Sequence, residues 1–271
     1  MPNADSNTPT SHEQSSAQHA VILHRVVRFE INPTTTGLGR YYELAIACQG
    51  TPDQETGYLV DIHAIDDLVR THLIPIINAA CQSAPEPSPA SLLPQLWAAA
   101  NANFNHPIVS LTWQLTPMKR IEMNTTTASD HFVFRQRYEF SASHRLHSEK
   151  LSPETNRQVF GKCNNPNGHG HNYTVEPTLT LPINDHTCTH TAVDSIVEEF
   201  ILAKLDHKHL NADCPSFDQT AGGVMPSVEN IAKYCYQQLQ APAGGLADGA
   251  ELVSITVWET DRTSCTYPAT I

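Results

Sequence analysis

Hydrophobic positions divide the chain into two halves, and each half predicts the same succession of elements. Each begins with two segments rich in β-branched and aromatic residues, a pattern typical of strands. Two segments with apolar residues at helical spacing follow, and one more apolar strand segment closes the half. In the first half we expect strands at 22–31 and 41–47, helices at 63–80 and 91–101, and a strand at 108–115. In the second half we expect strands at 132–140 and 172–181, helices at 192–205 and 227–240, and a strand at 252–260.

A short polar segment without apolar periodicity separates the two halves. We therefore expect a first domain at 20–123, a linker at 124–131 and a second domain at 132–271. The polar residues 1–19 that precede them are expected to form a disordered tail. The shared order of elements predicts an internal repeat. Its last strands align so that Trp113 corresponds to Trp258 and Gln114 corresponds to Glu259.

Composition argues against several classes of protein. The net charge is −12, from 16 basic and 28 acidic residues, which argues against a nucleic-acid-binding surface. No apolar run reaches the roughly 18 residues of a membrane-spanning helix, and the polar start lacks the basic and apolar regions of a signal peptide. Seven cysteines occur at wide spacing without a C-x-x-C pair. We therefore expect a reducing cytoplasm, without a disulfide framework or a cysteine-only zinc site.

Three histidines carry the strongest sign of metal chemistry. His169 and His171 lie two apart in a predicted strand, so their side chains share one face. His144 ends the preceding strand, and the loop between the strands would bring it beside this pair. Three histidine ligands with one open position are typical of catalytic zinc. An H-x-H pair alone is weak evidence, but three histidines on adjacent strand ends favour a metal site, whereas His147 and His209 are expected to be ordinary surface or core residues.

Other candidate residues are less specific on their own. Cys163 lies in a loop beside Lys162, and a basic neighbour lowers a thiol pKa and favours the reactive thiolate. Asp206 and His207 end a predicted helix, where the carboxylate can orient the imidazole and tune its basicity, although such pairs are common. Glu259 lies in an otherwise apolar strand. It is either a solvated edge residue or an acceptor for the guanidine-like edge of a heterocycle.

A family resemblance chooses among these alternatives. The segment 140–173, FSASHRLHSEKLSPETNRQVFGKCNNPNGHGHNY, closely resembles 6-pyruvoyl-tetrahydropterin synthase. So do the motifs LDHKHLN at 205–211, PSVEN at 226–230 and WETD at 258–261. The resemblance covers about 132–267. It implies the T-fold, an α+β fold in which antiparallel strands carry two helices on one face and assemble into barrels, here present as two tandem copies.

The resemblance also implies roles for individual residues. His144, His169 and His171 would hold zinc. Cys163, Asp206 and His207 would form the proton-transfer group. Glu259, together with Glu229, would anchor the pterin ring, although Glu229 is otherwise explained as an acid in the first turn of a helix.

The implied reaction converts 7,8-dihydroneopterin triphosphate to 6-pyruvoyl-tetrahydropterin with loss of triphosphate, a carbon–oxygen lyase step of tetrahydrobiopterin-type biosynthesis. One alternative is 6-carboxytetrahydropterin synthase of queuosine biosynthesis, which uses the same site. A third is a non-catalytic pterin-binding scaffold, against which a reactive thiol argues. The basic residues near the site either hold the triphosphate or lie in a solvated loop: Arg145, Lys150, Arg157 and Lys162.

The first half has lost the candidate chemistry. At the positions that correspond to Asp206, His207, Glu229 and Glu259 it carries Asn78, Ala79, Leu92 and Gln114. It also lacks an H-x-H pair. At one position the first half keeps an acidic residue that the second half lacks. The first half has Asp61 where the second has Thr189, a difference that changes a helix cap. We therefore expect residues 20–123 to be a degenerate copy without a metal site.

The resemblance finally implies an assembly. Related chains close barrels from several such units, and closure removes the exposed strand edges that invite aggregation. A chain with two units is expected to form a homo-oligomer, and three chains would supply six units. The degenerate copy would either alternate with active copies in one ring or form a separate ring that caps an active one.

Overall fold

The computed structural model describes residues 20–32, 39–127, 130–183 and 190–269, so the tail at 1–19 lies outside the described residues. The first half has strands β1 (Val21–Ile31), β2 (Arg40–Gly50), β3 (Ile108–Thr116) and β4 (Lys119–Asn124). Between β2 and β3, α1 (Ile62–Leu68) continues through a π-helical turn at Val69–Leu73 into α2 (Ile74–Cys81), and α3 (Pro89–Ala102) follows. Asp61 caps α1 by accepting a hydrogen bond from the His63 N–H.

The second half repeats this order with additions near its ends. It opens with β5 (His131–Gln136) and β6 (Tyr138–His144), then α4 (Pro153–Phe160), a 3-10 turn at Gly161–Asn164 and β7 (His169–Pro182). α5 (His190–Val197) continues through Glu198–Leu202 into α6 (Ala203–Leu205), before β8 (Lys208–His209) and α7 (Leu210–Asp213). Two single turns, Pro215–Phe217 and Gln219–Ala221, lead to α8 (Val228–Gly244), β9 (Glu251–Thr260) and β10 (Thr263–Tyr267).

The segments expected from the sequence form elements of the expected type, but the strand expected at 132–140 is divided into β5 and β6. The other boundaries differ by a few residues. The closing strands β4 and β10 were not expected. Both are short and follow a tight turn, and β10 is largely polar, so its hydrophobic pattern is weak. When β5 and β6 are counted as one interrupted strand, each half has the order of two strands, helices and two strands, and the second half adds α4 and β8.

One largely antiparallel sheet unites the two halves. Its strands follow the order β1-β2-β3-β4-β5-β7-β9-β10, because β4 pairs with β5 and β5 pairs with β7. β5 and β6 pair with the same edge of β7, β6 near the N-terminal end of β7 and β5 near its C-terminal end. β8 adds a short parallel pairing to β6. The polar segment expected as a linker thus joins two neighbouring strands of the same sheet.

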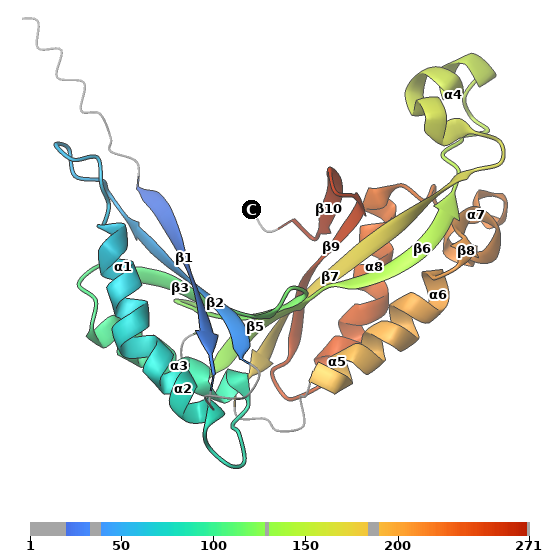
Figure 1. The fold of residues 1–271 in the computed structure, drawn as a ribbon. Helices are drawn as coiled ribbons and strands as arrows, with labels where there is room; N and C mark the ends of the chain where they lie inside the picture. Colours follow the sequence, from blue (N-terminus) through green and yellow to red (C-terminus); the bar gives the residue numbers. More distant parts are fainter. Residues whose placement is uncertain (1–19, 33–38, 128–129, 184–189, 270–271) are drawn as a thin grey trace, which may run out of the picture.

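The sheet bends into an open trough, and the helices of both halves lie on its outer side (Figure 1). In the first half, Leu44, Ile46 and Leu111 of the sheet are fully buried, as are Leu73 and Ile77 of the helices. In the second half Tyr173, Val175 and Val257 are buried in the same way. Each such side chain contributes about 1.5–3 kcal/mol by leaving water. The alternation of buried and exposed residues therefore fixes which face of each strand meets the helices.

The correspondence of Trp113 with Trp258 is wrong by one residue. Trp113 is 2% exposed, and its ring meets Tyr42 edge-on in the helix-covered core. The Trp258 ring instead lies under the Arg137 guanidinium, 4.9 Å from ring centroid to Cζ, on the inner face of the sheet. The last hairpin of each half gives the correct alignment of the two copies. Thr116 pairs with Lys119 and Thr260 pairs with Thr263, so Thr116 corresponds to Thr260.

In this register Gln114 corresponds to Trp258, and Leu115 stands where the second half has Glu259. The pairings of Phe29 with Tyr42 and of Phe140 with Tyr173 also correspond. Arg40 then takes the place of His171, and its guanidinium binds Glu86 through two hydrogen bonds of 2.7 and 2.8 Å. The first half still lacks the carboxylate, but an apolar residue and not an amide replaces it.

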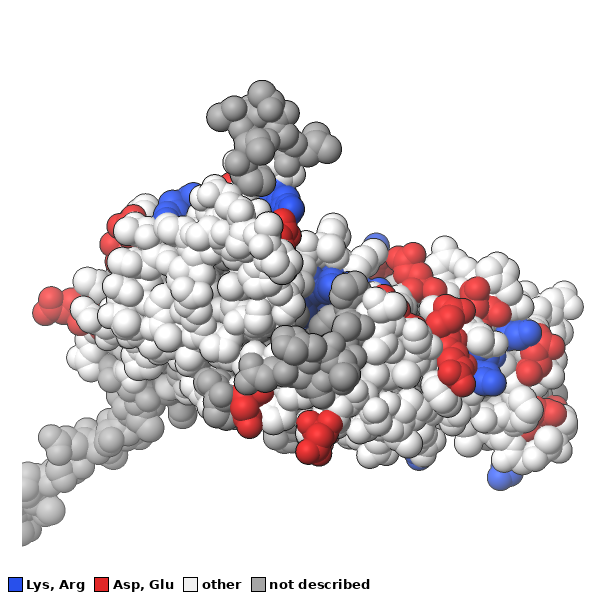
Figure 2. All heavy atoms as spheres, turned by 90° about the horizontal axis from the view of Figure 1, so that it is seen from below, with Lys and Arg blue, Asp and Glu red and all other residues white. Residues whose placement is uncertain are grey.

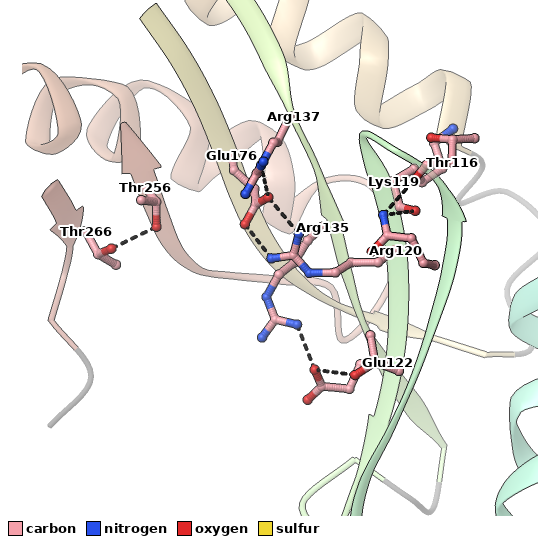
Figure 3. A network of polar contacts seen from close by, with 11 residues as sticks. Thr116, Lys119, Arg120, Glu122, Arg135, Arg137, Glu176, Thr256 and Thr266 are labelled. Atoms are coloured by element: carbon pink, nitrogen blue, oxygen red, sulfur yellow. Dashed lines mark hydrogen bonds and ion pairs between the residues drawn. The ribbon is translucent and has the colours of Figure 1, made fainter. Parts of the chain in front are cut away.

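A cluster of charged side chains fastens the halves together on the inner face of the sheet (Figure 3). Glu176 of β7 is 4% exposed and accepts hydrogen bonds from both terminal nitrogens of Arg120 on β4, at 2.7 and 2.9 Å. Arg137 donates a third, at 3.1 Å. Arg135 of β5 pairs with Glu122 of β4 at 2.9 Å. The strand pairing that joins the halves is thus reinforced by side chains from both of them.

The outer, helix-covered side shows mixed charge. Seen from below, most of this face carries uncharged side chains, and acidic side chains with a few basic ones gather toward the right of the view (Figure 2). Among the described atoms of that view, the Lys and Arg side chains form no continuous basic patch. Within the described part of the chain, no helix has the length and apolar character needed to cross a membrane.

We predict that Arg120→Met lowers the free energy of unfolding by about 1–3 kcal/mol, because it leaves the buried Glu176 carboxylate short of two donors. Urea unfolding of the full chain measures the change. Arg28→Met is the matched control, since Arg28 pairs with Glu43 on the surface, where an ion pair contributes about 0–1 kcal/mol. Equal effects of the two substitutions would contradict a special role for the buried pair.

Candidate active site

The three candidate histidines meet where β6 ends and β7 begins. In the antiparallel pairing, His144 lies opposite His169 and Ala142 lies opposite His171, so all three imidazoles share the helix-facing side of the sheet. One ring nitrogen from each can be chosen so that the three lie within 4.8 Å of one another. His144 Nε2 is 3.1 Å from His169 Nε2. The structure thus brings together the three residues that the sequence placed on adjacent strand ends.

Burial and a backbone carbonyl set the state of His144. Its side chain is fully buried, and its Nδ1 lies 2.7 Å from the Pro226 carbonyl oxygen, which can only accept a hydrogen bond. Nδ1 therefore carries the proton and Nε2 keeps its lone pair. Burial lowers the pKa of His144 to about 4, and burial followed by the neighbouring His171 lowers that of His169. The ring of His144 is thus a neutral base aimed at the other two imidazoles.

The donor set fits a metal ion. His171 Nε2 and His169 Nδ1 are both buried and lack hydrogen-bond partners in the described structure. Leaving such atoms unpaired costs free energy, and a cation among the three rings would satisfy His171 Nε2. Neutral imidazole nitrogens at close quarters are the usual ligands of zinc and related ions. These residues could therefore hold a metal ion.

Glu259 and Cys163 border the histidine cluster. A carboxylate oxygen of Glu259, on β9, lies 3.4 Å from His144 Nε2 and 3.8 Å from His171 Nε2. Burial, and after it the charge of Glu259, raises the pKa of the Cys163 thiol. The expectation that Lys162 lowers this pKa is therefore wrong for the chain without a bound cation. The negative neighbour and the loss of water both oppose formation of the thiolate.

Asp206 and His207 lie on the other edge of β6. Asp206 Oδ1 accepts a hydrogen bond of 2.8 Å from the Ser141 N–H, and Oδ2 lies 2.8 Å from His207 Nδ1. The Ser141 N–H, followed by His207, holds the pKa of Asp206 below its ordinary value. The His207 side chain is 83% exposed and its φ is 55°, which turns the chain sharply after the helix. Within the described residues, no hydrogen bond or ion pair joins this pair to Cys163.

The remaining candidates lie around the cluster. Glu229 is exposed in the first turn of α8, and its charge acts on the nearby thiol of Cys265. Arg145 hydrogen-bonds to Asn164, which holds the loop between β6 and β7. A surface hollow beside His169 is lined by Arg157, Gly161, Lys162, Asn164, Asn165 and Pro166. Two basic side chains thus lie next to the histidine cluster.

Sequence reasoning missed the groups that orient the ligands. Pro226 acts through its carbonyl, which no side-chain pattern reveals. Tyr173, fully buried, places its hydroxyl 3.3 Å from His144 Nδ1. Its position two residues after His171, on the same face, was the available signal. Gly168, with φ of 69°, lets the loop turn into β7 close to the His144 carbonyl.

Comparison with known proteins identifies the family. A family model described as 6-pyruvoyl tetrahydropterin synthase matches residues 134–270, which include all the candidate site residues. The chain belongs to this family. The 6-pyruvoyl tetrahydrobiopterin synthase of Homo sapiens is 42% identical over 137 residues, which are 49% of this chain and 88% of the relative. That of Poecilia reticulata is 45% identical over 103 residues, 37% of this chain and 67% of the relative.

A solved structure, that of Caenorhabditis elegans 6-pyruvoyl tetrahydropterin synthase, is 32% identical to this chain. It covers 52% of this chain and 96% of its own, with a TM-score of 0.45. The match of the family model begins within β5. The strands β1 to β4 and the helices between them therefore lie outside the residues that the family model matches.

We predict that Gly168→Ala destabilises the chain more than Gly222→Ala does. Both glycines have positive φ, at 69° and 89°, which costs a residue with a Cβ about 1–2 kcal/mol. A Cβ at 168 would also lie 2.9 Å from the His144 carbonyl oxygen, whereas one at 222 meets nothing within 4 Å. Urea unfolding of both variants measures the difference. Equal losses would show that the loop relaxes without moving His144.

Proposed function

We propose that this chain is a zinc-dependent lyase that converts 7,8-dihydroneopterin triphosphate to 6-pyruvoyl-tetrahydropterin and releases triphosphate. The observation that carries the proposal is the convergence of His144, His169 and His171 beside Glu259 and Cys163 in a chain of this family. The relatives named above carry the name of this activity. A cytoplasmic location, expected from the cysteines, stays a prediction.

The three histidines are proposed to hold the zinc ion through His144 Nε2, the unpaired His171 Nε2 and a nitrogen of His169. Zinc, when bound, supplies a Lewis acid that acidifies the carbon-bound protons next to the side-chain hydroxyls of the substrate. The Pro226 carbonyl keeps the proton of His144 on Nδ1 and so keeps Nε2 available. Ligand orientation by an outer hydrogen bond of this kind is general in metal sites.

The proton transfers are assigned to the chain's own side chains. Cys163 Sγ is proposed to remove a carbon-bound proton as the thiolate. His207, held by Asp206 at Nδ1, is proposed to return a proton from Nε2. Glu259, together with Glu229, is proposed to accept hydrogen bonds from the guanidine-like edge of the pterin. Arg157 and Lys162 lie beside His169, where a triphosphate chain can be neutralised.

Residues 20–123 are proposed to be a degenerate copy of the catalytic domain at 132–271. The shared strand order and the corresponding pairs Phe29–Tyr42 and Phe140–Tyr173 support a duplication. Arg40, bound to Glu86, stands at the position of His171, and Leu115 stands at that of Glu259. The first copy is therefore expected to leave metal binding and proton transfer to the second.

The chain is proposed to act as a homo-oligomer, for which the sequence predicts three chains. His207 is 83% exposed and makes no hydrogen bond with Cys163, so the proton-transfer group is not assembled among the described residues of one chain. A neighbouring chain against this edge of β6 would complete the site and remove water from it.

The reaction is tested by incubating purified protein with 7,8-dihydroneopterin triphosphate and separating the products by chromatography. We expect 6-pyruvoyl-tetrahydropterin and triphosphate. Release of acetaldehyde with 6-carboxytetrahydropterin would identify the alternative synthase of the queuosine pathway. Binding of the pterin without turnover would identify a scaffold and overturn the lyase.

We predict about one zinc ion per chain, because only the second half offers three converging imidazoles among the described residues. His171→Ala is expected to lose the metal, since two protein ligands leave an incomplete site. Elemental analysis after gel filtration measures the content. His147→Ala is the control, because that side chain bonds Asn164 outside the cluster and its loss should leave the metal in place. Two tightly held ions per chain would contradict a degenerate first copy.

We predict that Cys163→Ala keeps the fold and the metal but loses roughly 10²–10⁴-fold in kcat, the usual contribution of a general base. Steady-state kinetics and elemental analysis on the same sample separate the two effects. Cys81→Ala is the control, since Cys81 is also half-buried but ends α2 in the first half, away from the histidine cluster. Near-normal turnover of Cys163→Ala would move the base to another residue, with His207 the next candidate.

A further inference from the structure

The carboxylate of Glu259 faces the same space as the three candidate metal ligands. Glu259 follows the buried Val257 by two residues on β9, so its side chain lies on the helix-covered side of the sheet, where the histidines also lie. One of its oxygens is 3.4 Å from His144 Nε2 and 3.8 Å from His171 Nε2. The side chain is 17% exposed, so little water covers its charge.

Within the described residues, no hydrogen-bond donor explains why the carboxylate lies there. Nδ1 of His144 carries the ring proton that the Pro226 carbonyl accepts, so Nε2 turns a lone pair toward Glu259. His171 Nε2 has no hydrogen-bond partner, and 3.8 Å is too long for a hydrogen bond to the carboxylate. Two ring nitrogens and a carboxylate oxygen thus meet without a hydrogen bond among them. Such a cluster is costly unless a cation lies among its members.

The spacing of these atoms is that of ligands around one small ion. Zinc binds nitrogen and oxygen ligands at about 2.0–2.2 Å, so two ligands of a tetrahedral ion lie about 3.3–3.5 Å apart. His144 Nε2 is 3.1 Å from His169 Nε2 and 3.4 Å from the Glu259 oxygen. The 3.8 Å from that oxygen to His171 Nε2 is slightly longer, by an amount that a small side-chain rotation removes.

Charge also favours a carboxylate in the fourth position. Three neutral imidazoles would leave a divalent ion with both of its charges beside the fully buried ring of His144, where an uncompensated charge is costly. The Glu259 carboxylate offsets one of these charges, whereas a water molecule offsets none. Carboxylate oxygens are ordinary ligands of zinc in proteins.

We propose that Glu259 is the fourth ligand of the metal ion in the free protein, and that substrate binding moves it from the metal to the pterin ring. The second step rests on the proposed function, which assigns the guanidine-like edge of the pterin to Glu259. That edge presents two parallel N–H groups and engages both oxygens of a carboxylate. The bond from the metal to the Glu259 oxygen breaks, two hydrogen bonds from the pterin form, and one position on the metal becomes free.

This exchange makes access to the metal depend on the ring of the substrate. A compound that offers only hydroxyl or phosphate oxygens must compete with the bound carboxylate, whereas a ring with two parallel donors removes the carboxylate first. Glu259 therefore couples recognition of the heterocycle to opening of the metal site. The substrate class that it selects is a heterocycle with an amino group next to a ring N–H and a hydroxylated side chain.

Zinc affinity tests the first step without any substrate. Glu259→Gln and Glu259→Ala are compared with the parent by competition with a chelator, and circular dichroism shows that each variant is folded. We expect zinc to bind both variants at least about tenfold more weakly, since even an outer partner of a metal ligand contributes roughly 10–100-fold.

Glu229→Gln is the matched control for zinc affinity. It removes the same charge from the other proposed pterin anchor, which is exposed at the start of α8, and should keep the zinc affinity of the parent. Unchanged affinity in the Glu259 variants, or an equal loss in Glu229→Gln, would overturn Glu259 as a ligand.

Cobalt in place of zinc reports the ligands directly, because the visible absorption of Co²⁺ depends on their number and kind. We expect the free parent to show the spectrum of a four-coordinate ion, Glu259→Gln to show a different spectrum, and Glu229→Gln to match the parent. Identical spectra of the parent and Glu259→Gln would overturn the proposal. A sulfur-to-cobalt band in the near ultraviolet that Cys163→Ala removes would give the fourth position to Cys163 and would also overturn it.

A ring without a side chain tests the exchange. Pterin itself has the amino group and the ring N–H but no side-chain hydroxyl, and lumazine is the same ring with an oxygen in place of the amino group. We expect pterin to shift the Co²⁺ spectrum of the parent toward that of Glu259→Gln, and lumazine to leave it unchanged. Fluorescence titration measures binding of pterin separately.

The exchange and the proposed reaction fail in different ways. Pterin that does not bind, or that binds without changing the spectrum, would overturn the exchange. Weakened zinc binding in Glu259→Gln together with the expected spectral shift supports the exchange even if the parent converts no 7,8-dihydroneopterin triphosphate, a result that would overturn only the lyase.

Discussion

The pairing of β4 with β5 is the interaction on which the rest of the structure depends. It joins the strands of the two halves into one continuous sheet that bends in one direction. The guanidinium of Arg120 reaches across this junction to a carboxylate that is almost fully buried. Removing one partner of a buried ion pair leaves the other charge without a partner, which costs free energy. The ion pair of Arg120 with Glu176 therefore holds the two halves together in addition to the backbone hydrogen bonds.

The candidate site uses the same sheet as a scaffold. Antiparallel pairing sets His144 opposite His169, and period-two alternation places His171 beside them. Glu259 reaches the cluster because β9 is the other neighbour of β7. The histidines, the carboxylate and the thiol therefore depend on three adjacent strands and one loop. Asp206 and His207 depend on a different contact, the hydrogen bond of Asp206 to the edge of β6, which leaves the imidazole facing outwards.

Much of this arrangement could be predicted from the sequence, for identifiable reasons. Helices and strands with a strong apolar period were found where they were expected, and the H-x-H pair predicted a shared face. Local pattern failed where the decisive interaction lies between distant residues. Trp113 and Trp258 look equivalent in sequence, but their facing is set by pairing with β2 and β7. The pKa of Cys163 is controlled by burial and by Glu259. Glu259 is distant from Cys163 in the sequence, whereas the sequence displays only the adjacent Lys162.

The hydrogen bond from His144 to the Pro226 carbonyl has a consequence for how the site can evolve. Many metal-binding histidines are oriented by a carboxylate side chain, which a single substitution can remove or retune. Here the acceptor belongs to the main chain, so every amino acid at position 226 would supply it. The orientation of this ligand is therefore insensitive to the identity of its partner and sensitive only to the path of the backbone that leads into α8. Selection on the ligand's orientation acts on a loop conformation and not on a residue type.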